Sequence, residues 1–202
     1  MSHPLLAFLL FLLYAGLVFG LRTFQHLRRT GNTGFRGLSG RPGSLEWLGG
    51  ALFVVALVLA ALGPLAEWLG LVAPLVAVPA VLADLAVLLV LLGTAATLAA
   101  QAAMGAAWRI GVQAGERTEL VTGGPFALVR NPVFSAMLVT GAGLLLLAPN
   151  LLALAGFFAL LAAVELQVRF VEEPHLVRIH GERYRAYARR VGRFFPGLGT
   201  MP

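Results

Sequence analysis

The sequence predicts an all-α membrane protein: a bundle of five transmembrane helices followed by a cytoplasmic, amphipathic C-terminal segment. Of its 202 residues, 59% are hydrophobic and only 12% are charged, whereas soluble domains average about 25% charged residues. The mean hydropathy is +0.86, and several apolar runs approach the roughly 20 residues that a helix needs to cross a bilayer. We therefore treat residues 1–202 as a single integral membrane domain.

The apolar runs and the basic residues together predict the topology. Spans are expected at 4–21, 47–64, 75–103, 132–148 and 150–170. All fifteen basic residues are arginine, and five spans with the N-terminus outside place every arginine on one side, which the positive-inside rule makes cytoplasmic. No basic segment precedes the first span, so we expect a retained helix and not a cleaved signal peptide.

The segment between the first two spans, the third span and the net charge say less about function. The glycine-rich segment 31–44 is expected to be a surface loop, because its spacing fits no phosphate-binding pattern. Asp84, near the outer end of the third span, is either a functional carboxylate or a side chain that reaches the headgroups. The arginines border the membrane, so attraction to anionic lipids explains the net charge of +6 without nucleic acid.

The fourth span begins with a helix-start signature. Asn131 suits the N-cap, and Pro132 suits the first helical position. A helix N-terminus has free N–H groups and a positive dipole end, and Arg130 stands beside it. This predicts either a site for a carboxylate or phosphate or a plain helix start with an arginine that reaches the headgroups.

The fifth span ends in a group of charges. Glu165, Arg169, Glu172 and Glu173 are spaced three and four residues apart, which predicts one stripe of one helix. Structural salt bridging is one interpretation. The other is a pocket for a zwitterion, with its carboxylate at Arg130 and its ammonium group at the glutamates.

Beyond Pro174 the chain is a basic amphipathic segment that lies either on the membrane surface or over the pocket as a lid. Its expected apolar stripe consists of Leu176, His180, Tyr184, Tyr187 and Val191, with a break at Gly181. His175 and His180 have no third ligand nearby, and the chain has no cysteine, so we expect no metal.

Three ordered blocks resemble the membrane-embedded isoprenylcysteine carboxyl methyltransferase family and its bacterial relatives. The first is Leu120-Val121-Thr122-Gly123-Gly124-Pro125-Phe126 with Val129-Arg130-Asn131-Pro132-Val133-Phe134, the second is Glu172-Glu173, and the third is Gly181-Glu182-Arg183-Tyr184 with Tyr187, Arg190-Val191 and Phe195-Pro196. The resemblance covers residues 105–198. Asn131 stands where the family usually has histidine, and Phe126 and Phe134 where it has tyrosine.

The resemblance implies a methyltransferase of a bacterial cytoplasmic membrane that binds S-adenosylmethionine in a cytoplasmic pocket and releases S-adenosylhomocysteine. The implied cofactor contacts are Gln113, Thr118, Glu119, Leu120, Val121, Gly124, Phe126, Arg130, Asn131, Pro132, Val133, Glu172, Glu173, Tyr184 and Tyr187. Arg169 falls near the family's substrate-side arginine.

The expected reaction is direct displacement at the sulfonium methyl by a lipophilic thiol, carboxylate or amine that arrives from the membrane. Arg169 would orient a carboxylate, whereas a thiol or amine needs a base, for which Glu165 or a pocket glutamate is the candidate. The alternatives are an NADPH-dependent reductase of the sterol type, which generally has more spans, and a non-catalytic transporter or scaffold.

Overall fold

The computed structural model describes residues 2–33, 40–105 and 119–202, and this part of the chain is helical without a regular strand. The helices are α1 (His3–Ala15), the π-helical turn η1 (Gly16–Leu21), α2 (Arg22–Thr30), α3 (Leu45–Trp68), α4 (Ala80–Met104), the 3₁₀ turn η3 (Gly124–Ala127), α5 (Pro132–Leu147), α6 (Leu151–Leu166), the π-helical turn η4 (Gln167–Glu172), α7 (Glu173–His180) and α8 (Glu182–Arg190).

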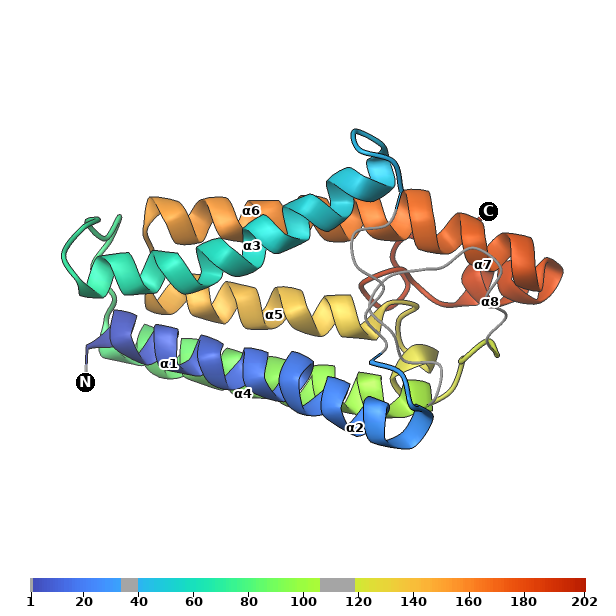
Figure 1. Ribbon diagram of the computed structural model, residues 1–202, viewed down its shortest axis with the longest axis horizontal. Helices are drawn as coiled ribbons and strands as arrows, with labels where there is room; N and C mark the ends of the chain where they lie inside the picture. The colour runs from blue at the N-terminus through green and yellow to red at the C-terminus, as the bar shows by residue number, and fades with distance from the viewer. Residues whose placement is uncertain (1, 34–39, 106–118) are drawn as a thin grey trace.

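The long helices run back and forth along one axis (Figure 1). The N-terminus and the turns at 69–79 and 148–150 lie at one end of the bundle. The other end, which we call the arginine end, holds α2, α7, α8 and the C-terminal tail. Most of the described arginines lie there, so the polar segments gather at one end as their charges predict.

Four helices of the described part are long and apolar enough to cross a membrane: His3–Thr30, Leu45–Trp68, Ala80–Met104 and Leu151–His180. The fourth predicted span, 132–148, corresponds to α5, whose 16 residues extend only about 24 Å. That is less than the roughly 30 Å of a bilayer's hydrocarbon core. The protein is therefore an integral membrane protein in which α5 is a shorter apolar helix between longer ones.

Two helices differ in extent from the spans predicted for them, for local reasons. The first helix continues to Thr30 and does not end near residue 21, because η1 joins α1 to α2 without a break. The third begins at Ala80 and not at 75, because Pro79 is in an extended conformation at the N-cap. The predicted break at Gly181 is confirmed: its φ of 53° lies in the left-handed region that favours glycine.

Glycines let the helices pack closely in two pairs, α4 with α5 and α3 with α6. A Cβ at Gly93 would overlap Thr140 Oγ1 and lie 2.8 Å from Thr140 N. On the other pair, a Cβ at Gly63 would lie 2.9 Å from Ala153 N. Small residues at such contacts are how membrane helices gain packing energy, since burial from lipid yields little.

Asn150 fastens the end of the bundle opposite the arginines. It is fully buried, accepts a bond from Ala153 N as the N-cap of α6, and donates to Gly63 O and Glu67 Oε2 of α3. The short turn between α5 and α6 is thereby tied to α3, which fixes the two helix pairs relative to each other.

Candidate functional site

The start of α5 and the C-terminal tail are joined main chain to main chain at the arginine end. Arg130 N donates to Gly192 O at 2.8 Å, and Asn131 N donates to Arg193 O at 3.1 Å. Ser135 Oγ donates to Phe194 O at 2.8 Å. The tail therefore folds back onto the helix start that the sequence predicts to be an anion site.

Asn131 occupies the N-cap position of α5 but does not cap it with its side chain, as the sequence predicts it would. Its Nδ2 donates instead to Arg193 O at 3.2 Å. Pro132 is at the first helical position as expected, and it is buried. The helix start thus has no side-chain cap, which leaves its first N–H groups to other acceptors.

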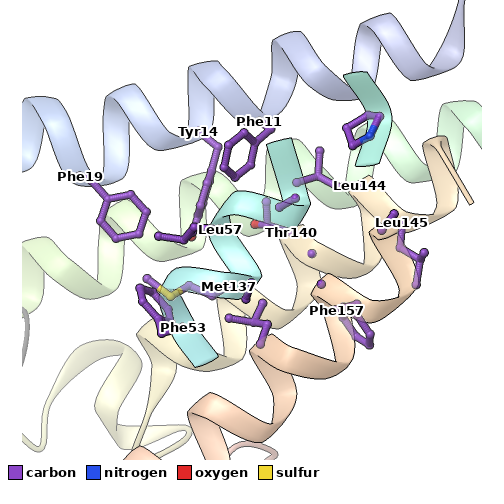
Figure 2. Close-up of a pocket in the computed structure, with 17 residues that line it drawn as sticks. Phe11, Tyr14, Phe19, Phe53, Leu57, Met137, Thr140, Leu144, Leu145 and Phe157 are labelled. Atoms are coloured by element: carbon purple, nitrogen blue, oxygen red, sulfur yellow. The ribbon is translucent and has the colours of Figure 1, made fainter. Parts of the chain in front are cut away.

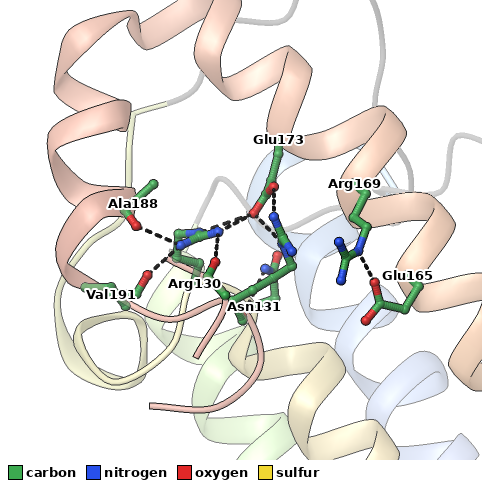
Figure 3. Close-up of polar contacts among 9 residues, drawn as sticks. Arg130, Asn131, Glu165, Arg169, Glu173, Ala188 and Val191 are labelled. Carbon is green, nitrogen blue, oxygen red and sulfur yellow. Dashed lines mark hydrogen bonds and ion pairs between the residues drawn. The ribbon is translucent and has the colours of Figure 1, made fainter. Parts of the chain in front are cut away.

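Arg130 is buried and lies at the centre of the site (Figure 3). Its Nε and Nη2 donate to Glu173 Oε1 at 3.2 and 2.6 Å. Its Nη1 donates to Ala188 O at 2.9 Å and Val191 O at 2.5 Å, and Nη2 also donates to Gly199 O at 3.0 Å. Every N–H of this guanidinium therefore has an acceptor within the protein.

Glu173 also accepts from a second arginine. Arg193 donates to its two carboxylate oxygens from Nε at 2.9 Å and Nη2 at 2.8 Å. Hydrogen bonding to Glu173 raises the pKa of Arg193, which is partly exposed. Two guanidinium groups thus share one carboxylate, and this cluster of Arg130, Glu173 and Arg193 carries an excess positive charge.

The oppositely charged walls predicted for the pocket therefore face each other and are in direct contact. Glu173, the first residue of α7, meets Arg130 at the start of α5, as the spacing suggests. Glu172 is only partly buried. Arg193 is the functional candidate that sequence reasoning misses. Its only signal is that it follows the Arg190-Val191 block.

Glu165 and Arg169 form a separate ion pair, one helical turn apart and more exposed than Glu173. Figure 3 shows the pair beside the cluster, and the charge of Glu165 acts on Arg193. The π-helical turn η4 contains Arg169 and separates Glu165 from Glu173, so the α-helical spacing used to predict one stripe does not hold through it.

Tyr184 and Tyr187 are buried beneath the 3₁₀ turn η3. Tyr187 donates from its hydroxyl to Phe126 O at 2.6 Å, and Leu120 packs against the two rings. Burial raises the pKa of Tyr187 to about 12, against the charge of Arg130. Burial, followed by the charge of Glu173, also raises the pKa of Tyr184. Both hydroxyls are therefore neutral at physiological pH.

The other predicted cofactor contacts border the same region. Phe126 is buried, Val121 and Val133 are partly buried, and Glu119 and Gly124 are exposed. Gln113 and Thr118 lie outside the described residues. Within the described ranges, no three His, Cys, Asp or Glu side chains are grouped as a metal would need.

An apolar cavity of about 50 Å³ lies in the middle of the bundle, between α1, α3, α5 and α6 (Figure 2). Its lining is aromatic and aliphatic apart from Tyr14 and Thr140, with Phe53, Met137 and Phe157 among the larger side chains. A water needs about 10–15 Å³ of such space, so the cavity has room for a short stretch of hydrocarbon chain.

Comparison with known proteins gives one match. The phospholipid methyltransferase family matches residues 82–183, which is half of the chain and includes α4, α5, α6 and α7. No curated protein and no solved structure matches the chain significantly. The matched part contains the start of α5 and Glu173, while Tyr187 and Arg193 follow it. The chain therefore belongs to the phospholipid methyltransferase family, the group of membrane methyltransferases that includes the isoprenylcysteine carboxyl methyltransferase-like proteins its sequence resembles.

Proposed function

We propose that the protein transfers a methyl group from S-adenosylmethionine to a lipophilic thiol, carboxylate or amine at the cytoplasmic face of a bacterial membrane. The family match over α4 to α7 carries this proposal. The acceptor is a lipid-type molecule, since the cavity between the helices is apolar and enclosed by aromatic side chains. In the proposed topology the N-terminus is outside, α5 is the fourth of five spans, and the arginine end is cytoplasmic.

The charges at the arginine end fit this cofactor. Its carboxylate needs a cation, and the cluster of Arg130, Glu173 and Arg193 has two guanidinium groups for one carboxylate. Arg193 is the more accessible of the two arginines, so it is the better placed to accept a second anion. The uncapped start of α5 adds N–H groups and a positive dipole end beside it.

The cofactor supplies an electrophilic methyl group on sulfur, and the protein positions and desolvates the reactants. Arg169 orients an acceptor carboxylate, while Glu165 accepts the proton of an acceptor thiol or amine. Their ion pair at the edge of the bundle places a cation and a base within one helical turn. Tyr184 and Tyr187 remain neutral there and close the site with uncharged hydroxyls.

Ligand-induced stabilisation tests the proposal. S-adenosylhomocysteine at 100 times its Kd should stabilise the purified protein by about 2.7 kcal/mol, whereas NADPH should not. Arg193→Gln should weaken S-adenosylhomocysteine binding by about tenfold, the loss of one charged hydrogen bond. Arg178→Gln, on the exposed side of α7, is the matched control and should bind normally.

Labelled methyl groups should also pass from S-adenosylmethionine into lipid-soluble product when the protein is supplied with a membrane lipid extract. Stabilisation by NADPH alone would favour the reductase alternative. No binding of either nucleotide would favour a transporter or scaffold, and the proposed function would then be wrong.

A further inference from the structure

A row of buried polar side chains crosses the interface between the first long helix and α4. It contains Tyr14, Thr97, Gln101 and Arg22, each at most 7% exposed. Thr97 and Gln101 are one turn apart on α4. Tyr14 and Arg22 come from α1 and α2, which lie outside the residues matched by the family. Polar groups inside a membrane bundle are expensive to bury, so such a row is a functional candidate.

Within the described part of the chain, two oxygen atoms of this row lack a hydrogen-bond partner. Gln101 Nε2 donates to Val18 O at 3.2 Å, but its Oε1 has no donor although the residue is only 2% exposed. The Tyr14 hydroxyl interacts with Thr97 without a hydrogen bond of ordinary geometry. The Thr97 hydroxyl itself donates to Gly93 O at 2.8 Å. A buried acceptor without a donor is destabilising and uncommon.

Gln101 is held in this orientation from two sides. Arg22 Nη2 donates to Gln101 O at 2.7 Å, which fastens the last turns of α4 to α2. The bond to Val18 O fixes the amide itself, and Val18 lies in the π-helical turn η1. Because Nε2 is engaged there, Oε1 is the atom that remains to accept from another molecule. π-Helical turns within longer helices occur frequently at functional sites.

The orientation of α2 is consistent with buried polar side chains where α2 packs against the end of α4. Phe24 and Leu27 are exposed on its outer face, whereas Arg22 and His26 are buried on its inner face. A helix in water would show the opposite pattern. The outer face of α2 therefore suits lipid, and its polar face is turned toward the end of α4.

Tyr14 connects this row to the apolar cavity. Its ring lines the cavity, where Figure 2 shows it extending inward from α1 toward Leu57. Its hydroxyl, at the far end of the ring, faces Thr97, one turn from Gln101. A molecule with its hydrocarbon chain in the cavity thus finds the Tyr14 hydroxyl at the cavity's polar border, and Gln101 lies one helical turn beyond Thr97 on α4. Tyr14 also belongs to an apolar cluster that includes Val133 and Phe134 at the start of α5.

We propose that Gln101 Oε1, with the Tyr14 hydroxyl, binds the polar head of the lipophilic acceptor and selects a head that donates an O–H or N–H hydrogen bond. Arg22 is a positioning residue, because it holds α4 and Gln101 in place. This inference rests on the proposed function, since it assigns the polar end of the acceptor in that reaction. It adds Gln101 of α4 as a specificity determinant, and Gln101 is held by Arg22 of α2, which lies outside the residues that the family match covers.

Binding of two probes that differ only in their donor tests this assignment without cofactor. The purified protein is titrated with dodecanol and with dodecyl methyl ether at equal mole fractions in one detergent, and the shift of the unfolding midpoint gives each affinity. The wild-type protein should bind the alcohol about 3- to 10-fold more tightly, which is the usual worth of one hydrogen bond.

Three variants test whether the preference for the alcohol depends on the Oε1 acceptor of Gln101 or only on packing around that side chain. Gln101→Met should abolish the preference for the alcohol, while Gln101→Glu, which keeps an oxygen acceptor, should retain it. Gln167→Met, the same substitution against α3, should also retain it. Equal affinities for alcohol and ether in the wild-type protein, or an unchanged preference in Gln101→Met, would overturn the assignment. Because the titration contains no cofactor, its outcome is independent of whether S-adenosylhomocysteine binds.

Discussion

Arg130 shows at the scale of one residue why a buried charge needs several partners. Removing a guanidinium from water costs several kcal/mol, which only close hydrogen bonds and an opposite charge offset. Here Glu173 supplies the charge, and the main-chain oxygens of Ala188, Val191 and Gly199 take the remaining N–H groups. The residue is thus the joint that holds the tail, and all of its N–H groups are engaged within the protein.

Glu173→Gln should destabilise the protein by about 3–5 kcal/mol, because it leaves two guanidinium groups without their shared carboxylate. Equilibrium unfolding in detergent measures the change. The control is Glu182→Gln, which removes the exposed partner of Arg185 and Arg189 and should cost no more than about 1 kcal/mol. Equal effects of the two substitutions would show that the cluster contributes no special stability.

The buried tyrosines predict a loss of stability at alkaline pH. The pKa of Tyr187 is about 12 in the folded protein and about 10 when unfolded. The unfolded chain therefore releases this proton first. The stabilising contribution is complete below pH 10 and is lost as the pH rises toward 12. Ultraviolet titration of tyrosinate measures it, and Tyr187→Phe should lack the transition near pH 12.

At the scale of helices, the sequence predicts most of the bundle because apolar runs and arginine clusters are strong signals. The starts of α5 and α6, the break at Gly181 and the membrane methyltransferase family all follow from it. The π-helical turns do not, because they keep the apolar composition of the helices around them. The sequence also does not predict that the first helix continues to Thr30. Arg22 and His26 are polar and would be expected at the surface, although both are buried in the structure.

The close contact between α4 and α5 predicts that substitution of alanine for glycine lowers the stability of the protein at Gly93 but not at Gly16. Gly93→Ala would place a Cβ against the backbone of α5, and the required shift should cost about 1–3 kcal/mol. Gly16→Ala, in η1 with no atom near the new methyl group, should be neutral or stabilise by up to about 1 kcal/mol. Thermal unfolding of both variants measures the difference, and a neutral Gly93→Ala would contradict the close packing.

At the scale of the whole molecule, the site is harder to predict than the fold because it depends on contacts between distant segments. Arg193 reaches Glu173 through a tail whose path no local pattern shows. The same is true of Gln101, which is an unremarkable polar residue in the sequence and a buried acceptor only once η1 packs against it. The family motifs identify the start of α5, but not what it contacts.

The proposed topology can be tested directly, since the chain contains no cysteine. Leu71→Cys, exposed in the turn between α3 and α4, should react with a membrane-impermeant maleimide added outside intact cells. Arg185→Cys, on exposed α8, should react only after the membrane is permeabilised. Labelling of both from outside would exclude the five-span arrangement, in which these two positions lie on opposite sides.

The partners of Arg130 are separated from it by 43 to 69 residues along the chain. All of them follow α5 in the sequence, so they leave the ribosome after it. Arg130 then lies at the start of α5 without these partners until the later segments have been made. Assembly of this joint is therefore a late event, and a ribosome that stalls within α6 would leave a bundle whose arginine end has not formed.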